Sequence, residues 1–173
     1  CVTPPVYDPK LGQRSVFDAL LDARAAYGAK KPIIEDIDRK PLTYDDLVRA
    51  SFAMGRRIAG MTQRGENVGV LLPSSVGVAV TFFALHAFGR VPTMLNFTAG
   101  LRNLRSACRT AKVKRVLTAR RFIEQGKFHD IIDALTETGC EIVYLEDGRA
   151  SLGLTDKVYA LAAAALPRMF RTV

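Results

Sequence analysis

The sequence predicts an α/β fold, a doubly wound and mostly parallel sheet with helices on both of its faces. Three observations favour it. Short apolar runs without polar alternation recur along the chain, as expected of parallel strands that are covered on both faces. Segments with helical spacing of apolar residues separate these runs, and strand–helix alternation is typical of this architecture. Residues 68–96 read as one continuous strand–helix–strand unit, which should cross over right-handedly.

Residues 68–96 form the centre of this predicted fold. The apolar run at residues 68–72 indicates a central strand, and Pro73 should end it because proline has no N–H for the ladder. We expect Ser74 or Ser75 to cap the following helix by accepting a hydrogen bond from a backbone N–H of its first turn. A second apolar strand is predicted at residues 91–95.

The helix between these strands, residues 76–88, is apolar almost all round, so most of its circumference should be covered. Phe82 and Leu85 are therefore expected in the core. We interpret His86, in the same helix, as a hydrogen-bonded core histidine and not as a ligand. The other histidine, His129, precedes Asp130 on a polar face and is expected to be solvated.

Residues 1–14 carry three prolines and a glycine and are expected to be an irregular lead-in, whereas residues 15–173 are expected to form a single α/β subdomain. Ser15 with Asp18, and Thr43 with Asp46, resemble capping boxes and indicate two helix starts. The other predicted strands are a hairpin of residues 32–35 and 41–43, a strand at 113–119 and a strand at 140–145. Predicted helices end at about residues 27, 59 and 111. Two further helices are predicted, one at 120–138 broken at Gly126 and one at 155–170 interrupted at Pro167.

The chain has 173 residues, of which 49% are hydrophobic and 24% charged, a composition typical of a globular domain. It begins with Cys1 instead of methionine, so we expect a fragment, a processed form or a trimmed chain. No secretory signal is visible, and no apolar run reaches the ~18 residues of a spanning helix. Cys1, Cys108 and Cys140 form no CxxC pair, which favours reduced thiols in a cytoplasmic protein.

Motifs that carry chemistry are sparse. Gly55 and Gly60 have the spacing of a phosphate loop, but Met61 stands where that loop needs lysine. Two lone histidines and scattered cysteines do not make a metal cluster. Ser74 and Ser75 lack a base at a recognisable spacing, and capping explains them. The residues therefore indicate no catalytic, cofactor-binding or metal-binding position.

The net charge of +8 is concentrated in one window. Between residues 101 and 130, only Glu124 and Asp130 oppose nine basic residues, and nine minus two leaves +7 there. The nine are Arg102, Arg105, Arg109, Lys112, Lys114, Arg115, Arg120, Arg121 and Lys127.

Some of these cations fall within one quadrant of a helical wheel, and we call them the basic stripe: Arg102, Arg105, Arg109 and Lys112. The adjoining side of the wheel carries Leu101, Leu104, Ala107, Cys108 and Ala111. Two interpretations remain open, a solvated helix face or a docking surface for an acidic partner. Nucleic acid is disfavoured because no exposed aromatic residues interleave with the cations and no binding motif accompanies them.

Several stretches together resemble the start of the adenylate-forming ligase superfamily, which includes acyl-CoA and acyl-carrier-protein synthetases. Leu42-Thr-Tyr-Asp-Asp-Leu47 is similar to its early Leu-Thr-Tyr-x-Glu-Leu motif. Val68-Gly-Val-Leu-Leu-Pro-Ser-Ser75 is similar to its Val-x-Val-x-Leu-Pro-Asn-Ser strand and turn. The segment Val113-Lys-Arg-Val-Leu-Thr118 resembles the family's Ala-Lys-x-Leu-Ile-Thr segment.

Three stretches look most like one branch, the acyl-carrier-protein synthetase half of bifunctional 2-acylglycerophosphoethanolamine acyltransferases. They are Thr81-Phe-Phe-Ala-Leu-His-Ala-Phe-Gly-Arg-Val-Pro-Thr-Met-Leu-Asn-Phe97, Ala107-Cys-Arg-Thr-Ala111 and Val143-Tyr-Leu-Glu-Asp147. The resemblance covers roughly residues 32–170 and rests on the order and spacing of the motifs.

The resemblance implies that a parent protein uses ATP and magnesium to adenylate a carboxylate and then passes the acyl group to a thiol. The family's phosphate loop, Tyr-x-x-Thr-Glu segment, ribose-binding Asp and C-terminal Lys are missing from this chain, and so is the acyltransferase His-x4-Asp signature. No catalytic residue of the family can be carried over. We expect the chain alone to be inactive, as a scaffold within an AMP-forming acid–thiol ligase that can also have acyltransferase activity.

The implied partners are the missing remainder of the ligase, an acidic acyl carrier protein on the basic stripe, and an anionic membrane surface, where basic residues contribute roughly 1 kcal/mol each. We expect a cytoplasmic parent and leave its membrane association open. The rival interpretation is a stand-alone α/β interaction module that binds an acidic protein or anionic lipid through the basic helix.

Overall fold

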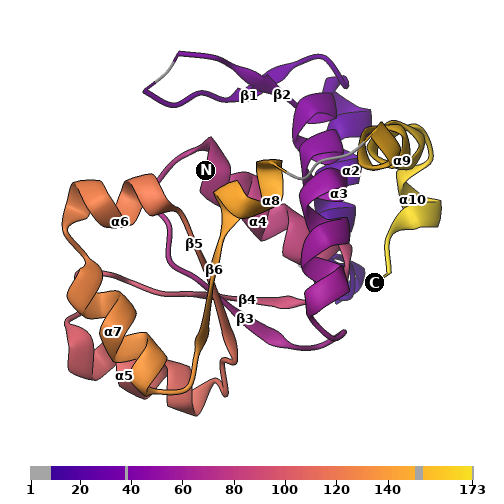
Figure 1. Cartoon of the computed structure of the whole chain (residues 1–173). Helices are drawn as coiled ribbons and strands as arrows, with labels where there is room; N and C mark the ends of the chain where they lie inside the picture. Colours follow the sequence, from indigo (N-terminus) through magenta and orange to yellow (C-terminus); the bar gives the residue numbers. More distant parts are fainter. Residues whose placement is uncertain (1–8, 38, 151–153, 173) are drawn as a thin grey trace, which may run out of the picture.

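The computed structural model describes residues 9–37, 39–150 and 154–172. Within them, a parallel sheet has the strand order β4-β3-β5-β6. Strand β3 spans Asn67–Val70, β4 spans Val91–Met94, β5 spans Arg115–Thr118 and β6 spans Glu141–Tyr144. Helices lie on both sides of this sheet (Figure 1). The predicted doubly wound α/β fold is confirmed.

The chain reverses its direction across the sheet after β4. Helix α4 (Val76–Ala87) links β3 to β4 at one edge, and α5 (Leu101–Thr110) carries the chain back past β3 to β5. Helices α6 (Arg120–Gly126) and α7 (His129–Glu137) then lead to β6 at the other edge. The topological switch point therefore lies between β3 and β5.

One side of the sheet is covered by α4 and by α3 (Tyr44–Met61), which pack closely against each other. Gly55 of α3 lies at their contact, where an added Cβ would be 2.4 Å from the Phe88 ring and 2.8 Å from the Ala84 carbonyl oxygen. Close helix packing, and not a phosphate loop, explains this glycine. The core between these helices and the sheet consists of Ile58, Val68, Val70, Ala84, Leu85 and Leu117.

A further layer of helices packs on the outside of α3 and α4 (Figure 1). It consists of α2 (Val16–Tyr27), α9 (Leu154–Ala165) and α10 (Pro167–Phe170). The rings of Phe17 and Phe52 join α2 to α3, with their centroids 5.3 Å apart in an edge-to-face arrangement that favours aromatic contact.

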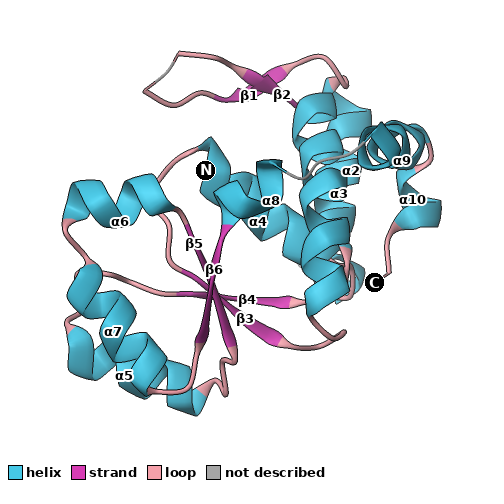
Figure 2. Ribbon diagram, in the orientation of Figure 1, coloured by secondary structure: helices cyan, strands magenta, loops and turns pink. Residues whose placement is uncertain are grey.

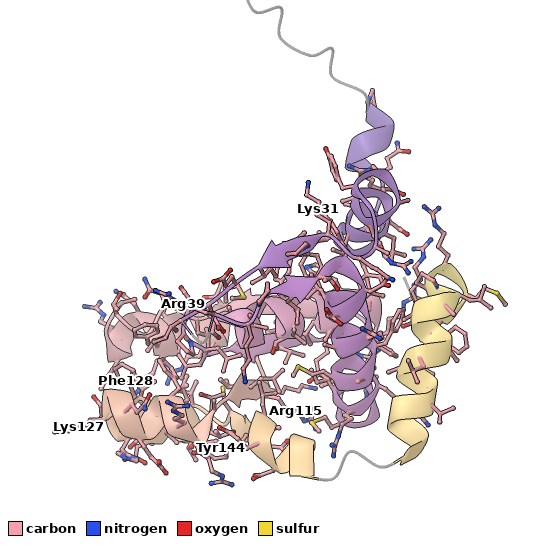
Figure 3. All side chains as sticks on the ribbon, turned by 90° about the horizontal axis from the view of Figure 1, so that it is seen from above. Lys31, Arg39, Arg115, Lys127, Phe128 and Tyr144 are labelled. Carbon is pink, nitrogen blue, oxygen red and sulfur yellow. The ribbon has the colours of Figure 1, made fainter. Side chains whose placement is uncertain are left out.

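Helices α5, α6 and α7 cover the other side of the sheet. The predicted break at Gly126 separates α6 from α7, and Lys127 ends α6 with a left-handed φ of 53°. A Cβ at Gly126 would lie 2.1 Å from the Phe128 ring, so the break also makes room for that side chain. Phe128 belongs to an aromatic cluster with Phe97 and Phe122, whose ring centroids are 5.1 to 5.2 Å apart. Figure 3 labels Lys127 and Phe128 at the end of the molecule away from α9.

A small antiparallel hairpin of β1 (Pro32–Ile34) and β2 (Leu42–Thr43) stands apart from the main sheet (Figure 2). Its strands were predicted, and so was the capping box in which Thr43 and Asp46 begin α3. Ser15 likewise accepts a hydrogen bond from the Asp18 N–H at the start of α2.

The predicted serine cap of α4 is wrong. Ser75 occupies the cap position, but its hydroxyl donates to the Pro73 carbonyl oxygen at 3.3 Å. The Asp36 carboxylate, which follows β1 in the hairpin, accepts the Val76 N–H at 3.2 Å instead. A carboxylate suits this position because the N-terminus of a helix carries partial positive charge.

Two predicted boundaries also need correction. The lead-in is not wholly irregular, since Pro9–Gly12 forms a helical turn, α1. Strand β6 ends at Tyr144, and Leu145, predicted as its last residue, begins the unpredicted helix α8 (Leu145–Ala150). Glu146 and Asp147 lie in the first turn of α8, where the helix dipole favours acidic side chains.

Helix α4 is covered less evenly than its sequence predicts. Leu85 is fully buried, but Phe82 and His86 are only half-buried, and their ring centroids lie 4.6 Å apart. Burial lowers the pKa of His86, and its imidazole makes no hydrogen bond within the described part of the chain. The expectations of a hydrogen-bonded core histidine at position 86 and of Phe82 in the core are therefore wrong.

Candidate functional site

Helix α5 places part of the basic stripe on its outer surface. Arg102 and Arg109 are exposed, while Leu104 and Cys108 on the opposite side are buried against the sheet. Lys112 does not belong to the helical stripe, because α5 ends at Thr110 and Lys112 follows in a left-handed turn with φ 51°. Ala107, placed on the inner side by the helical wheel, is exposed.

The folded chain also brings acidic partners to several cations of the basic window. Arg105 pairs with Glu137 of α7 at 2.5 Å, which removes it from the free part of the stripe. Arg120 pairs with Asp147 at 2.7 Å and lies over the Tyr144 ring at 4.1 Å. Glu137 and Asp147 lie outside residues 101–130. The net charge of +7 counted along that window therefore overstates the positive charge of the folded surface.

Arg115 is also paired, with Glu66 and Glu141. The other six cations of the window are exposed and have no ion pair within the described residues. They are Arg102, Arg109, Lys112, Lys114, Arg121 and Lys127. Only Arg102 and Arg109 lie on the outer surface of one helix, seven residues apart, so about 10 Å separates their positions along the helix axis.

The amino ends of the strands are held by buried and partly buried polar contacts. Arg115, which begins β5 and is labelled in Figure 3, pairs with Glu66 at 3.0 Å and with Glu141 at 2.9 Å. The Asn67 side-chain amide donates to the Ala111 carbonyl oxygen at 2.7 Å. These contacts join three strands and the end of α5 at the amino end of the sheet.

Arg90 is the most deeply buried cation at the amino end of the sheet, with 9% of its surface exposed. Its guanidinium donates to the Thr62 carbonyl oxygen at 2.6 Å, the Thr62 hydroxyl at 3.0 Å, and the carbonyl oxygens of Ala59 and Phe88. These carbonyls belong to the C-terminal ends of α3 and α4, where the helix dipoles favour a cation. Burial lowers the Arg90 pKa from its ordinary value. No local sequence pattern predicts the buried position of Arg90, because its hydrogen-bond partners lie up to 31 positions away.

The carboxyl ends of the strands are more open. Thr118 is buried and donates to the Leu71 carbonyl oxygen at 2.8 Å, which joins β5 to β3 beside the switch point. Beyond it, Ser74 and Asn96 are exposed in the loops after β3 and β4. Open α/β sheets bind ligands outside the carboxyl ends of their strands at such a switch point. The carboxyl end of the sheet is therefore the candidate functional site.

Among the described residues, no nucleophile and base come together at the carboxyl end of the sheet. Ser74 and Ser75 lie at the N-terminal end of α4, whereas His86 lies at the opposite end of the same helix. The thiols are also unsuited to chemistry, because Cys108 and Cys140 are buried and unpaired, and burial raises the pKa of Cys108 to about 12. Cys1 lies outside the described residues.

The described residues contain no cluster of side chains typical of a protein-held metal ion. No three His, Cys, Asp or Glu side chains among them lie together as a metal site needs. No helix in the described ranges is long and apolar enough to cross a membrane.

Comparison with known proteins identifies the wider family. The family model described as "AMP-binding enzyme" matches residues 21–164, which is most of the chain. VinN in complex with 3-methylaspartate is 22% identical over 87% of this chain, with a TM-score of 0.67. Apo MatB from Rhodopseudomonas palustris is 22% identical over 76% of this chain, with a TM-score of 0.61. The N-terminal subdomain of Klebsiella oxytoca NpsA is 13% identical over 81%, with a TM-score of 0.64.

These similarities cover only part of each known protein. The chain spans 38% of the VinN chain, 25% of MatB and 33% of the NpsA subdomain. At such identities the solved structures establish the fold, and the family model establishes the relationship. The fold of this chain resembles part of the NpsA N-terminal subdomain, and the chain belongs to the AMP-binding enzyme family.

Proposed function

We propose that this chain is the N-terminal part of an ATP-dependent ligase that adenylates a fatty acid and transfers the acyl group to the thiol of an acyl carrier protein. The observation that carries the proposal is the AMP-binding enzyme match over residues 21–164. The preference for a fatty acid and a carrier protein rests on the three stretches that resemble the acyl-carrier-protein synthetase branch, residues 81–97, 107–111 and 143–147. The same branch suggests 2-acylglycerophosphoethanolamine acyltransferase activity elsewhere in the parent.

Within such a ligase the chain acts as a scaffold. Its two central strands, β3 and β5, are mostly buried, and Arg90 and Arg115 hold the amino end of its sheet. ATP with magnesium would supply the AMP group that activates the carboxylate, with pyrophosphate as the leaving group. The residues of this chain would hold the sheet on which the remainder of the ligase places its own reacting groups.

The acid specificity is tested with the full-length protein. ATP–pyrophosphate exchange is measured with saturated fatty acids of different lengths and with L-aspartate, the amino acid bound in one VinN structure. Exchange stimulated by fatty acids and not by aspartate supports the proposal. Exchange with aspartate alone would move the chain to a different branch of the family.

The carrier protein would dock on α5. Arg102 and Arg109 are exposed, lie on the same side of the helix and have no ion pair in the described structure, so an acidic partner can reach both. Exposed charge of this kind mainly speeds encounter and is weakened by salt. Arg105 is left out of this surface because Glu137 already neutralises it.

The docking test is a double charge reversal, Arg102→Glu with Arg109→Glu, in the full-length ligase. We expect a higher KM for the carrier protein, a weaker dependence of that KM on salt, and unchanged pyrophosphate exchange. Arg121→Glu with Lys127→Glu is the matched control, because it removes the same charge from exposed positions on and beside α6. An equal rise of KM in both double variants would mean that net charge, and not docking on α5, sets the encounter rate.

The stand-alone interaction module and the anionic membrane are separated from this proposal by two simple observations. A reading frame that encodes a phosphate-loop motif within a few dozen residues after Val173 supports the ligase. Vesicles that contain anionic lipid test the membrane, since binding that Arg102→Glu and Arg109→Glu abolish would assign the basic stripe to lipid instead of to a carrier protein.

A further inference from the structure

We propose that the free edge of β4, together with the open side of α4, receives a β-strand from the remaining polypeptide of the parent ligase. We call this surface the β4 edge and define it by Ala79, Phe82, His86, Pro92 and Met94. The inference rests on the proposed function, because it takes the remainder of the ligase as the partner.

The backbone of β4 is paired on one side only within the described residues. The N–H groups of Val91 and Leu95 donate to carbonyl oxygens on the β3 side, each at 2.9 Å. Because alternate residues of a strand point their N–H and C=O groups in opposite directions, those of Met94 point away from β3. Pro92 also points outward, where its missing N–H costs the sheet no hydrogen bond. Its carbonyl and both groups of Met94 remain available to another strand.

The side chains at this edge are apolar and uncovered. Met94 is 52% exposed and Val91 is 47% exposed, although both lie in a strand of a mainly buried sheet. The register pairs Met94 with Val70, so the Met94 side chain lies on the α4 side of the sheet. A soluble domain usually blunts a strand edge with charge, and no charged residue occurs in β4.

The neighbouring side of α4 has the same character. At 100° per residue, Ala79, Phe82 and His86 fall on one side of the helix, between the side that faces the sheet and the side that faces α2. All three are half-buried, and Phe82 packs on His86 and on Phe83 without belonging to a core cluster. The one ordinarily charged residue between positions 76 and 96 is Arg90, which is buried.

The opposite edge of the sheet is different. Its strand β6 begins with Glu141, which pairs with Arg115, and ends at Tyr144, which lies under the Arg120 guanidinium. Helix α8 follows directly. Charge and a following helix are common protections of an edge strand. Within the part of the chain that the structure describes, β4 is therefore the one of the two edge strands with free backbone groups beside an apolar surface.

The remainder of the ligase is the partner that these observations favour. The chain spans 25–38% of the VinN and MatB chains that it resembles, so a much larger part of such a ligase must pack somewhere on it. An apolar surface without charge suits a permanent contact within one polypeptide better than a transient contact with a carrier protein.

Methionine oxidation tests the proposal without relying on catalysis. The chain and the full-length ligase are treated with dilute hydrogen peroxide, and the oxidation rate of each methionine is measured by peptide mass spectrometry. We expect the Met94 rate to fall by at least an order of magnitude in the full-length protein. Equal Met94 rates in the two proteins would overturn the inference. Protection of Met94 that already appears in the chain alone, and grows with its concentration, would assign the edge to a second copy instead.

A matched pair of substitutions provides an independent test. Met94→Lys places a charge on the β4 edge, and Met169→Lys places the same charge on α10, where the side chain is 76% exposed. In the chain alone, both variants should keep the thermal midpoint of the unsubstituted chain. In the full-length ligase, Met94→Lys should lower the midpoint and shift Phe82 and His86 NMR signals, whereas Met169→Lys should do neither. An unchanged midpoint for Met94→Lys would overturn the proposal.

The failure of this inference is distinguishable from the failure of the proposed function. Fatty-acid-dependent pyrophosphate exchange by the unsubstituted full-length protein tests the function alone. Met94 protection tests the edge alone. An active ligase with an unprotected Met94 refutes only the inference, whereas a protected Met94 in a protein that activates no fatty acid refutes only the function.

Discussion

The two ends of the parallel sheet are built differently. At the amino end, Arg90 is buried and its guanidinium makes four hydrogen bonds. Arg115 of β5 pairs with Glu66, which directly precedes β3, and with Glu141 of β6. At the carboxyl end, Ser74 and Asn96 are exposed in loops, and a distant carboxylate, that of Asp36, caps α4. We therefore expect substitutions at the amino end to destabilise the chain more than substitutions at the carboxyl end. The carboxyl end, where α/β sheets bind ligands, is left free for function.

The strongest challenge to this contrast is Arg90→Met, which keeps much of the side-chain volume and removes the charge. Four acceptors at the ends of α3 and α4 would lose their donor. We expect a loss of about 3–5 kcal/mol in the free energy of unfolding, because each buried acceptor that is left without a donor costs about 1–3 kcal/mol. Chemical denaturation measures it. Arg102→Met, at an exposed position, is the control and should change that free energy by no more than about 0.5 kcal/mol.

Within α4, Leu85→Ala and Phe82→Ala should separate the covered side from the open side. Leu85 is fully buried, so truncation should cost about 2–5 kcal/mol through lost burial and a cavity. Phe82 is half-buried and should cost clearly less in the chain alone. Thermal or urea unfolding of both variants gives the comparison. Equal losses would show that the open side of α4 is part of the core.

At the carboxyl end, Asp36→Ala should destabilise α4 by about 0.5–2 kcal/mol, the usual contribution of a helix cap. Ser75→Ala should have almost no effect, since its hydroxyl bonds only to the Pro73 carbonyl oxygen. Amide hydrogen exchange of Val76 and its neighbours detects the loss locally. A larger loss for Ser75→Ala than for Asp36→Ala would restore the cap that the sequence predicted.

The smallest expected effect concerns pH. Burial lowers the pKa of His86 below its ordinary 6.5, so the folded chain favours neutral imidazole more strongly than the unfolded chain does. The resulting stability is present above pH 6.5 and declines as the pH falls below 6.5 and through the lowered pKa. His86→Gln should therefore reduce the drop in thermal midpoint between pH 7.5 and pH 5. An identical drop in both proteins would place the acid sensitivity elsewhere.

Much of this fold follows from local sequence patterns. Apolar runs identified β3 and β4, and the capping pair Thr43 and Asp46 marked the start of α3. Such signals are readable because they act between residues close in sequence. Pro92 also carried usable information, since proline in a strand indicates an outward-facing edge position.

The missed features depend on contacts that the sequence order hides. Asp36 reaches Val76 across 40 positions, and Glu137 reaches Arg105 across 32. The helical wheel placed Lys112 on the stripe because it assumed that α5 continues through that residue, whereas the backbone turns left-handed there. The basic stripe was predictable only as a run of positive charge. Which of its cations are neutralised by acidic partners depends on the folded arrangement.

The most direct test of the central claim compares the chain with its full-length parent in one assay. Both are incubated with ATP, magnesium and a fatty acid, and pyrophosphate release is measured against a blank without acid, after circular dichroism has shown that the chain is folded. A scaffold without its own reacting groups should release no more pyrophosphate than the blank, while the full-length protein should be active. Fatty-acid-dependent release by the folded chain alone would contradict the scaffold role.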